Sequence, residues 1–226
     1  MTGVTDLPAG TTVVDRRGCL ILPGFIDAHI HYPQTDVIAS HGRQLLDWLT
    51  DYTFPAEAAF LDEKHAAQTS EFFLDELLRN GTTTAAVFAT VHAASVDALF
   101  GAAQARGMRL LAGKVMMDRH CPEFLRDTAA SSYEDSAALI RRWHGKGRLG
   151  YVVTPRFAVS STDEQLRLAG RLLDEYPGVH LQTHIAENRD EIRWVAELFP
   201  WSKSYLDVYD RFGLVRKGAL FGHCIH

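Results

Sequence analysis

The sequence is short of cysteine and of long apolar runs, and each shortage excludes a class of protein. Its 226 residues contain three cysteines, which are too few for a disulfide framework and form no CxxC pair of a structural zinc site. No apolar run approaches the roughly 20 residues that a membrane-spanning helix needs. We therefore expect a protein of the reducing cytoplasm that has no membrane partner.

The sequence also lacks a large excess of charge of one sign, and no nucleotide-binding glycine motif follows its first predicted strand. The net charge is −5, and no block of like charges suggests nucleic acid or an anionic membrane as a partner. No GxGxxG fingerprint follows the first predicted strand, and a P-loop is absent everywhere, so a dinucleotide-binding first βα turn and a P-loop are excluded. The expected partner is a small-molecule substrate.

What the sequence does have is a repeated alternation of short apolar runs and helical patterns. Parallel strands covered by helices are typical of such near-continuous apolar runs. The expected strands are residues 24–31, 82–89, 109–117, 149–157, 179–187 and 218–226. This pattern predicts an α/β fold of βαβ units, which fits both a doubly wound sheet and a (β/α)8 barrel.

Polar residues at the ends of the predicted strands favour the barrel. The stretch "LPGFIDAHIH" ends in His29 and His31, and residues two apart on a strand point to the same side. Residues 179–187 end with His184 and Glu187, and the last strand contains His223. These side chains come together at one mouth only if the strands close into a barrel, whose catalytic groups lie at the carboxyl ends of strands.

Three neutral imidazoles are suited to a catalytic zinc ion, which keeps one position for water and lowers the pKa of that water toward about 7. Glu187 is the best-placed carboxylate to move protons between water and a substrate. Each residue alone also has an ordinary structural interpretation. A single strand-end histidine is usually a satisfied polar group, Arg156 could form a surface salt bridge, and Asp27 could be structural or catalytic.

The stretch "PGFIDAHIH" resembles the first strand of the amidohydrolase superfamily. Five further stretches are similar to the guanine deaminase family within it: "HIHYPQTD", "LLDWLTDYTFPAE", "NGTTTAAVFATVH", "VTPRF" and "HIAENRDEI". The resemblance runs from about Leu22 to the end of the sequence. It implies an incomplete (β/α)8 TIM-type barrel of about six βα units, preceded by the remnant of a small β-sandwich.

The resemblance implies a role for each strand-end residue. His29, His31 and His184 would bind one Zn²⁺ ion per subunit. His223 would hydrogen-bond the water or the substrate, and Glu187 would be the proton shuttle.

By the same resemblance, Gln34, Arg156 and Phe157 would hold guanine. Arginine and glutamine can donate hydrogen bonds to the ring acceptors O6 and N7, and phenylalanine can stack on the purine. The implied reaction is zinc-dependent hydrolysis of guanine to xanthine and ammonia, carried out by a protein that is a homodimer when full length. Trp48 and Phe54 could wall the purine or belong to the core.

The sequence departs from the family pattern at its end. Family members continue for two more βα units and supply an aspartate from strand eight, whereas this sequence stops at His226 on the sixth strand. We therefore expect a fragment, with residues 1–22 as the sandwich remnant and residues 23–226 as a truncated barrel, that is inactive in isolation. Two alternatives remain open: an amidohydrolase acting on another purine, pterin or triazine ring, and a non-catalytic truncated chain.

Overall fold

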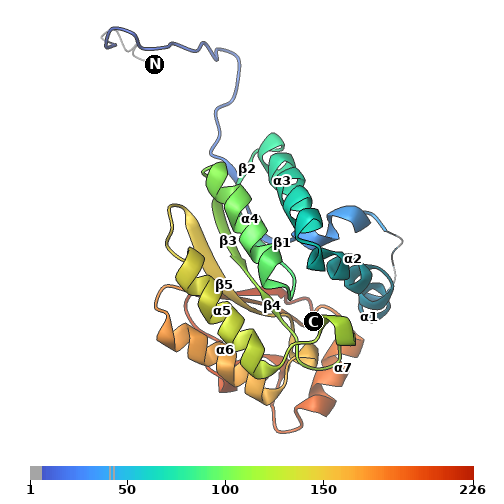
Figure 1. The fold of residues 1–226 in the computed structure, drawn as a ribbon. Helices are drawn as coiled ribbons and strands as arrows, with labels where there is room; N and C mark the ends of the chain where they lie inside the picture. Colours follow the sequence, from blue (N-terminus) through green and yellow to red (C-terminus); the bar gives the residue numbers. More distant parts are fainter. Residues whose placement is uncertain (1–6, 41, 43) are drawn as a thin grey trace.

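The computed structural model describes residues 7–40, 42 and 44–226, and these form one curved, wholly parallel sheet with helices outside it (Figure 1). The sheet order is β1-β2-β3-β5-β6-β7, with the short β4 also paired to β5. The strands are β1 (Phe25–His31), β2 (Thr82–Phe88), β3 (Arg109–Gly113), β4 (Val115–Met116), β5 (Leu149–Pro155), β6 (His180–Ile185) and β7 (Ala219–His223).

Helices connect successive strands and cover the outer face of the sheet. The α-helices are α1 (Leu45–Trp48), α2 (Phe54–Ala58), α3 (Glu63–Arg79), α4 (Ala93–Ala105), α5 (Ala129–Trp143), α6 (Asp163–Glu175), α7 (Arg189–Leu198) and α8 (Tyr205–Arg211). Shorter turns are η1 (Tyr32–Val37), the π-helical η2 (Leu49–Thr53), η3 (Ala59–Leu61), η4 (Glu123–Leu125) and η5 (Ala158–Ser160). None of the helices in the described ranges is long and apolar enough to cross a membrane.

The predicted α/β architecture of six strands is confirmed. The expected strand 109–117 is divided into β3 and β4, but the two pieces keep the same register against β5, with Ala112 opposite Tyr151 and Val115 opposite Thr154. They therefore act as one strand of a nearly closed barrel. Side chains such as Val87, Ala112 and Tyr151 are fully buried and fill the space between strands and helices.

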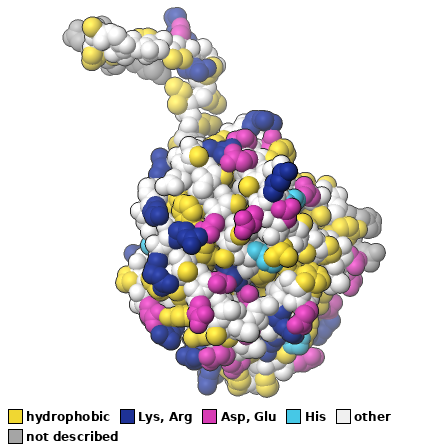
Figure 2. Space-filling view, in the orientation of Figure 1, with side chains coloured by type: hydrophobic (Ala, Val, Ile, Leu, Met, Phe, Trp, Pro, Cys, Tyr) yellow, Lys and Arg dark blue, Asp and Glu magenta, His cyan; other side chains and the backbone are white. Residues whose placement is uncertain are grey.

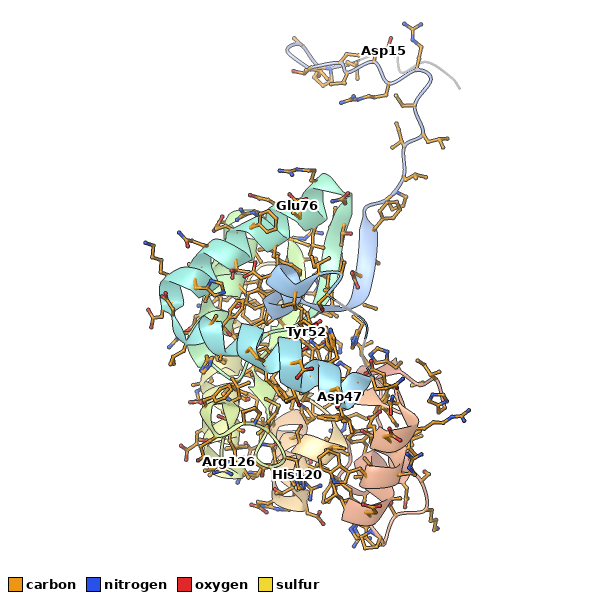
Figure 3. All side chains as sticks on the ribbon, turned by 90° about the vertical axis from the view of Figure 1, so that its right-hand side faces the viewer. Asp15, Asp47, Tyr52, Glu76, His120 and Arg126 are labelled. Carbon is orange, nitrogen blue, oxygen red and sulfur yellow. The ribbon has the colours of Figure 1, made fainter. Side chains whose placement is uncertain are left out.

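The segment before β1 differs from expectation. The stretch "TTVVDRRGCLILPG" there predicts short strands around a turn, but residues 7–24 contain no strand. Backbone hydrogen bonds within this segment close local turns, such as the one that the Cys19 N–H donates to the Arg16 carbonyl. A strand needs a partner for its ladder, and this segment runs away from the barrel, with Asp15 near its far end (Figures 1 and 3). The assignment of residues 1–22 to a sandwich remnant stays a prediction, and residues 1–6 lie outside the described part.

The surface carries charges of both signs in close alternation. Figure 2 shows lysine and arginine side chains interspersed with aspartate and glutamate over the visible face of the barrel. Many of these charges form short-range pairs along one helix, such as Arg167 with Glu164 on α6. Such exposed pairs stabilise the fold little.

Candidate active site

All eight residues predicted for the site line one cavity of about 240 Å³ at the carboxyl ends of the strands. They are His29, His31, Gln34, Arg156, Phe157, His184, Glu187 and His223. Leu45, Trp48 and Leu49, from the helical segment after β1, complete the wall. Residues from four strand ends that are far apart in the sequence therefore meet at one mouth, which is the arrangement that a barrel predicts.

A bulge in β1 aims its two histidines into this cavity. The register against β2 shifts between Asp27 and Ile30, so the chain between them leaves the regular ladder. The Asp27 carboxylate accepts a hydrogen bond from the His29 backbone N–H at 3.0 Å. Bulges of this kind re-aim side chains next to active sites. Asp27 thus has a structural contact here: it satisfies a donor on the bulged stretch.

The orientation of His184 is fixed by the backbone of the neighbouring strand end. Its Nδ1 lies 2.7 Å from the Arg156 carbonyl oxygen, an acceptor, so Nδ1 carries the proton and donates it. The other nitrogen, Nε2, keeps its lone pair and lies 3.0 Å from Nε2 of His31. A backbone carbonyl that fixes the tautomer in this way is typical of metal-binding histidines.

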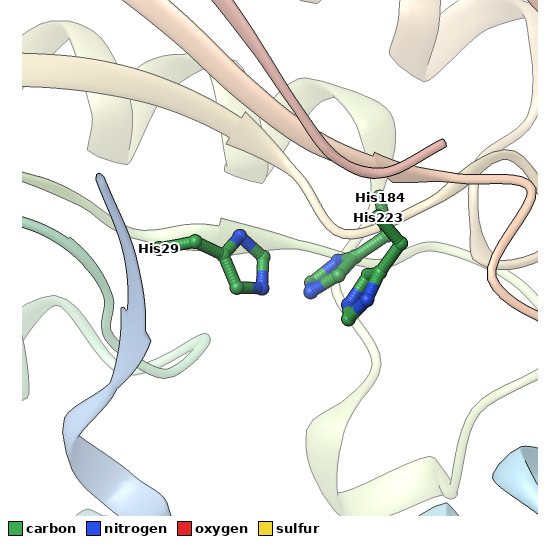
Figure 4. Close-up of side chains that lie close together, drawn as sticks. All are labelled: His29, His184 and His223. Carbon is green, nitrogen blue, oxygen red and sulfur yellow. The ribbon is translucent and has the colours of Figure 1, made fainter. Parts of the chain in front are cut away.

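The nitrogen atoms around His184 fit a zinc ion. One ligand atom each from His29, His184 and His223 lies within 4.8 Å of the others, and the three rings face a common space from two sides (Figure 4). Tetrahedral ligands at about 2.0–2.1 Å from zinc are about 3.3 Å apart, close to the 3.0 Å between His31 and His184.

The protonation states also fit a metal. Burial lowers the pKa of His31 and of His184 well below the usual range, and the charge of neighbouring histidines lowers both further. Both rings are therefore neutral near neutral pH, as ligation requires. His223 lies in one nitrogen cluster with His29 and His184. The sequence predicted His31 as the third metal ligand and His223 as a group beside the ligands. Which of these two histidines binds the metal stays a prediction.

Glu187 lies at the edge of the nitrogen cluster. Its Oε2 is 3.3 Å from Nε2 of His223. Burial, with the negative charge of Glu191, raises the pKa of Glu187 to about 7, and Arg156 opposes this rise. A carboxyl group of that pKa can both accept and release a proton near neutrality, which suits a general acid and base.

The ends of β6 and β7 hold these groups in a strained backbone. Ala186 and His223 have φ angles of 53° and 75°, in the left-handed region that residues other than glycine seldom adopt. Backbone strain of this kind is often found at functional sites.

Gly222 makes room for His29 where β7 approaches β1. A Cβ atom at Gly222 would lie 2.5 Å from Cε1 of His29, too close for any real contact. We expect Gly222→Ala to displace the His29 ring and to weaken zinc binding about 10- to 100-fold, the range for changes that disturb ligand orientation. Zinc titration against a competing chelator measures this. Gly101→Ala on α4, where a new Cβ meets nothing within 4 Å, is the control; equal zinc affinity of both variants would contradict the expectation.

Arg156 enters the cavity from the end of β5 and is held from behind. Its Nη1 donates to both carboxylate oxygens of Glu57 on α2, at 2.7 and 2.8 Å. The guanidinium carbon also lies 5.4 Å from the centre of the Phe54 ring, within the range of a cation–π contact. The "FPAE" stretch thus supplies the support of this arginine. Phe54 belongs to the core and contacts the site from behind, whereas Trp48 lines the cavity directly.

Residues 20–226 match the Amidohydrolase family. The chain belongs to the amidohydrolase family. Guanine deaminase of Escherichia coli (strain K12) is 54% identical over 224 residues, which cover 99% of this chain and 51% of that protein. The amidohydrolase chain therefore spans about half the length of the curated relatives it matches.

Two solved structures share this amidohydrolase fold at high similarity. The structure titled E. coli guanine deaminase has a TM-score of 0.89 and 55% identity, over 90% of this chain and 47% of that chain. Guanine deaminase from C. acetobutylicum, solved with guanine bound in its active site, has a TM-score of 0.92 and 36% identity, over 98% and 54% of the two chains. Both support the TIM-type fold that the sequence predicted.

Sequence reasoning missed a set of buried polar residues behind the amidohydrolase site. Glu191, fully buried, accepts hydrogen bonds from the backbone N–H of Glu187 at 2.9 Å and from the Tyr205 hydroxyl at 2.7 Å. The Tyr205 hydroxyl also accepts from the Ala158 N–H, next to Phe157. This network links the loop that contains Phe157 to the loop that contains Glu187.

Two signals in the sequence point to the missed residues. Glu191 stands three positions after Asn188, and the pair forms a capping box at the start of α7, a pattern readable from sequence. Glu57 stands three positions after Phe54 and three before Phe60, so helical spacing puts it on the buried face. The tyrosines of α8 carry no comparable signal, because many buried tyrosines only fill space.

Proposed function

We propose that this amidohydrolase catalyses the hydrolytic deamination of guanine to xanthine and ammonia. The observation that carries the proposal is the meeting of four histidines and Glu187 with Gln34, Arg156 and Phe157 around one cavity. The guanine deaminases that match nearly the whole chain support the choice of substrate. Triazine hydrolases among the similar solved structures are only 18–19% identical to this chain, so they support the fold and not an alternative substrate.

The metal in this proposal is zinc, one ion per subunit, held by His29, His31 and His184. It would supply Lewis acidity, which lowers the pKa of water toward neutrality. The nitrogen-rich donor set and the tautomer of His184 support this choice.

The protein groups position guanine and move protons. Arg156 and Gln34 donate hydrogen bonds to the ring acceptors, and Phe157 packs on the purine face. Glu187 accepts a proton from the attacking water and delivers it to a ring nitrogen as the water oxygen adds to C2. His223, in contact with Glu187, holds the water or the substrate during this transfer. Glu187 then carries the proton of the new C2 hydroxyl group to the amino nitrogen, the C2–N bond breaks, and ammonia and xanthine result.

The test uses the complete polypeptide that the gene encodes, established by reading the DNA beyond the codon for His226 and called the gene product below. We expect the purified gene product to convert guanine to xanthine and to release one equivalent of ammonia. Dialysis against a chelator should abolish turnover, and added zinc should restore it. Absence of xanthine from the zinc-loaded protein, or turnover of a triazine or pterin in place of guanine, would overturn the proposal.

A cytoplasmic location and a homodimeric state belong to the same proposal and rest on the sequence. Sedimentation of the gene product measures the second, and a monomer at all concentrations would refute it.

A further inference from the structure

The Arg156–Glu57 pair is buried on both sides. The exposed fraction is 2% for Arg156 and 0% for Glu57, and Glu57 is outside the group of residues that line the cavity. Only the arginine therefore reaches a bound ligand. Both contacts to Glu57 use the same nitrogen, Nη1, so the carboxylate does not occupy the N–H groups of Nε and Nη2.

The pair also fixes the charge of the cavity wall. The arginine is always protonated in proteins, and a single unpaired charge in a buried site attracts or repels a ligand much more strongly than in water. The Glu57 carboxylate, in direct contact with the guanidinium, cancels its charge at close range. Arg156 therefore presents hydrogen-bond donors to the cavity, while the Arg156–Glu57 pair as a whole carries little net charge.

We propose that Glu57 sets the selectivity of this cavity for uncharged purine rings over anionic ones, by cancelling the charge of Arg156 while leaving its donors free. Glu57 is a positioning residue in this account, because it acts on the ligand through the arginine. The inference rests on the proposed function, in that it takes a purine as the ligand, and it names a residue that decides which purines are accepted.

The experiment compares two ligands that are not deaminated at C2. Hypoxanthine is neutral near neutral pH, whereas urate is a monoanion there. Dissociation constants for both are measured by calorimetry with the zinc-loaded gene product and with its Glu57→Gln variant, which keeps the shape and an oxygen acceptor for Nη1. We expect Glu57→Gln to shift the ratio of the two constants by about tenfold in favour of urate. Any effect of the larger size of urate cancels in this comparison.

A purely structural role of Glu57 gives a different result. Both ligands would then weaken by the same factor, and the inference would be overturned while the proposed function stood. Glu57→Asp, which restores the charge, should return the ratio toward that of the unmodified protein. Glu134→Gln on the exposed face of α5 controls for charge removal in general. If the unmodified gene product binds neither purine, the proposed function fails and the inference with it.

A second measurement needs no change at Glu57 and decides the matter if Glu57→Gln does not fold. In the metal-free Glu187→Gln variant, which lacks the cavity carboxyl whose pKa is about 7, the affinity for xanthine is measured below and above the pH at which xanthine itself loses a proton, with hypoxanthine as the reference at each pH. If Glu57 cancels the charge of Arg156, the xanthine anion should bind no more tightly than neutral xanthine. About tenfold tighter binding of the anion would show an uncompensated charge and overturn the inference.

Discussion

Replacing Glu57 by leucine should lower the free energy of unfolding by about 3–5 kcal/mol, the cost of removing one partner from a buried ion pair. The loss is large because Arg156 keeps its charge and is left with no carboxylate in a site that water scarcely reaches. Burial raises the pKa of Glu57, and the charge of Arg156 with its hydrogen bond partly offsets that rise. Urea denaturation of the metal-free gene product measures the change.

The double variant Glu57→Leu with Arg156→Met distinguishes the effect of an unpaired buried charge from the effect of lost side-chain volume. Two apolar residues of similar volume leave no buried charge, so most of the lost stability should return. Glu134→Leu, at an exposed position of α5, should change stability by less than about 0.5 kcal/mol. A loss below about 1 kcal/mol for the single variant would match an exposed pair and would contradict the account of Arg156 given above.

The parts of the fold that sequence predicted well are those governed by local pattern. The apolar strands and the capped helices follow from spacing and from residues such as Asp62, which accepts the Lys64 N–H at the start of α3. The segment before β1 was predicted as strands and is not, because strand formation there depends on a partner. Residues such as Val13 and Val14 favour strands, but no neighbouring strand covers them in the described part of the chain. Their exposed fractions are 71% and 62%.

The residues that line the candidate cavity could be gathered from the sequence more completely than the residues that hold them in place. His29, His31, His184 and Glu187 stand at strand ends, where topology alone brings polar residues together. Glu57 comes from a helix between the first two strands, and its contact with Arg156 joins residues 99 positions apart. No spacing rule specifies which buried acid meets which arginine. Tyr205 likewise reaches Glu191 only because α8 packs beside α7.

Replacing Glu187 by glutamine should lower turnover of guanine by the gene product about 10²- to 10⁴-fold, the usual contribution of a general acid–base group. Glutamine keeps the size of the side chain and its position beside His223, but it cannot accept a proton from water and release it to the ring. Zinc content and the affinity for hypoxanthine should change little, because neither requires that proton transfer. Steady-state rates, metal analysis and calorimetry on the same preparation provide the three measurements.

Glu197→Gln on the exposed face of α7 removes the same carboxylate charge ten positions further along the chain and should leave turnover unchanged. Comparison of the two variants separates proton transfer from net charge. If Glu187→Gln lost zinc as well as activity, the carboxylate would be acting as a support for the metal site, and the proton shuttle would have to be another group. If turnover survived, His223 would be the candidate to take over the proton, since its Nε2 lies 3.3 Å from Oε2 of Glu187. The His223→Gln variant would then lose the activity that Glu187→Gln keeps.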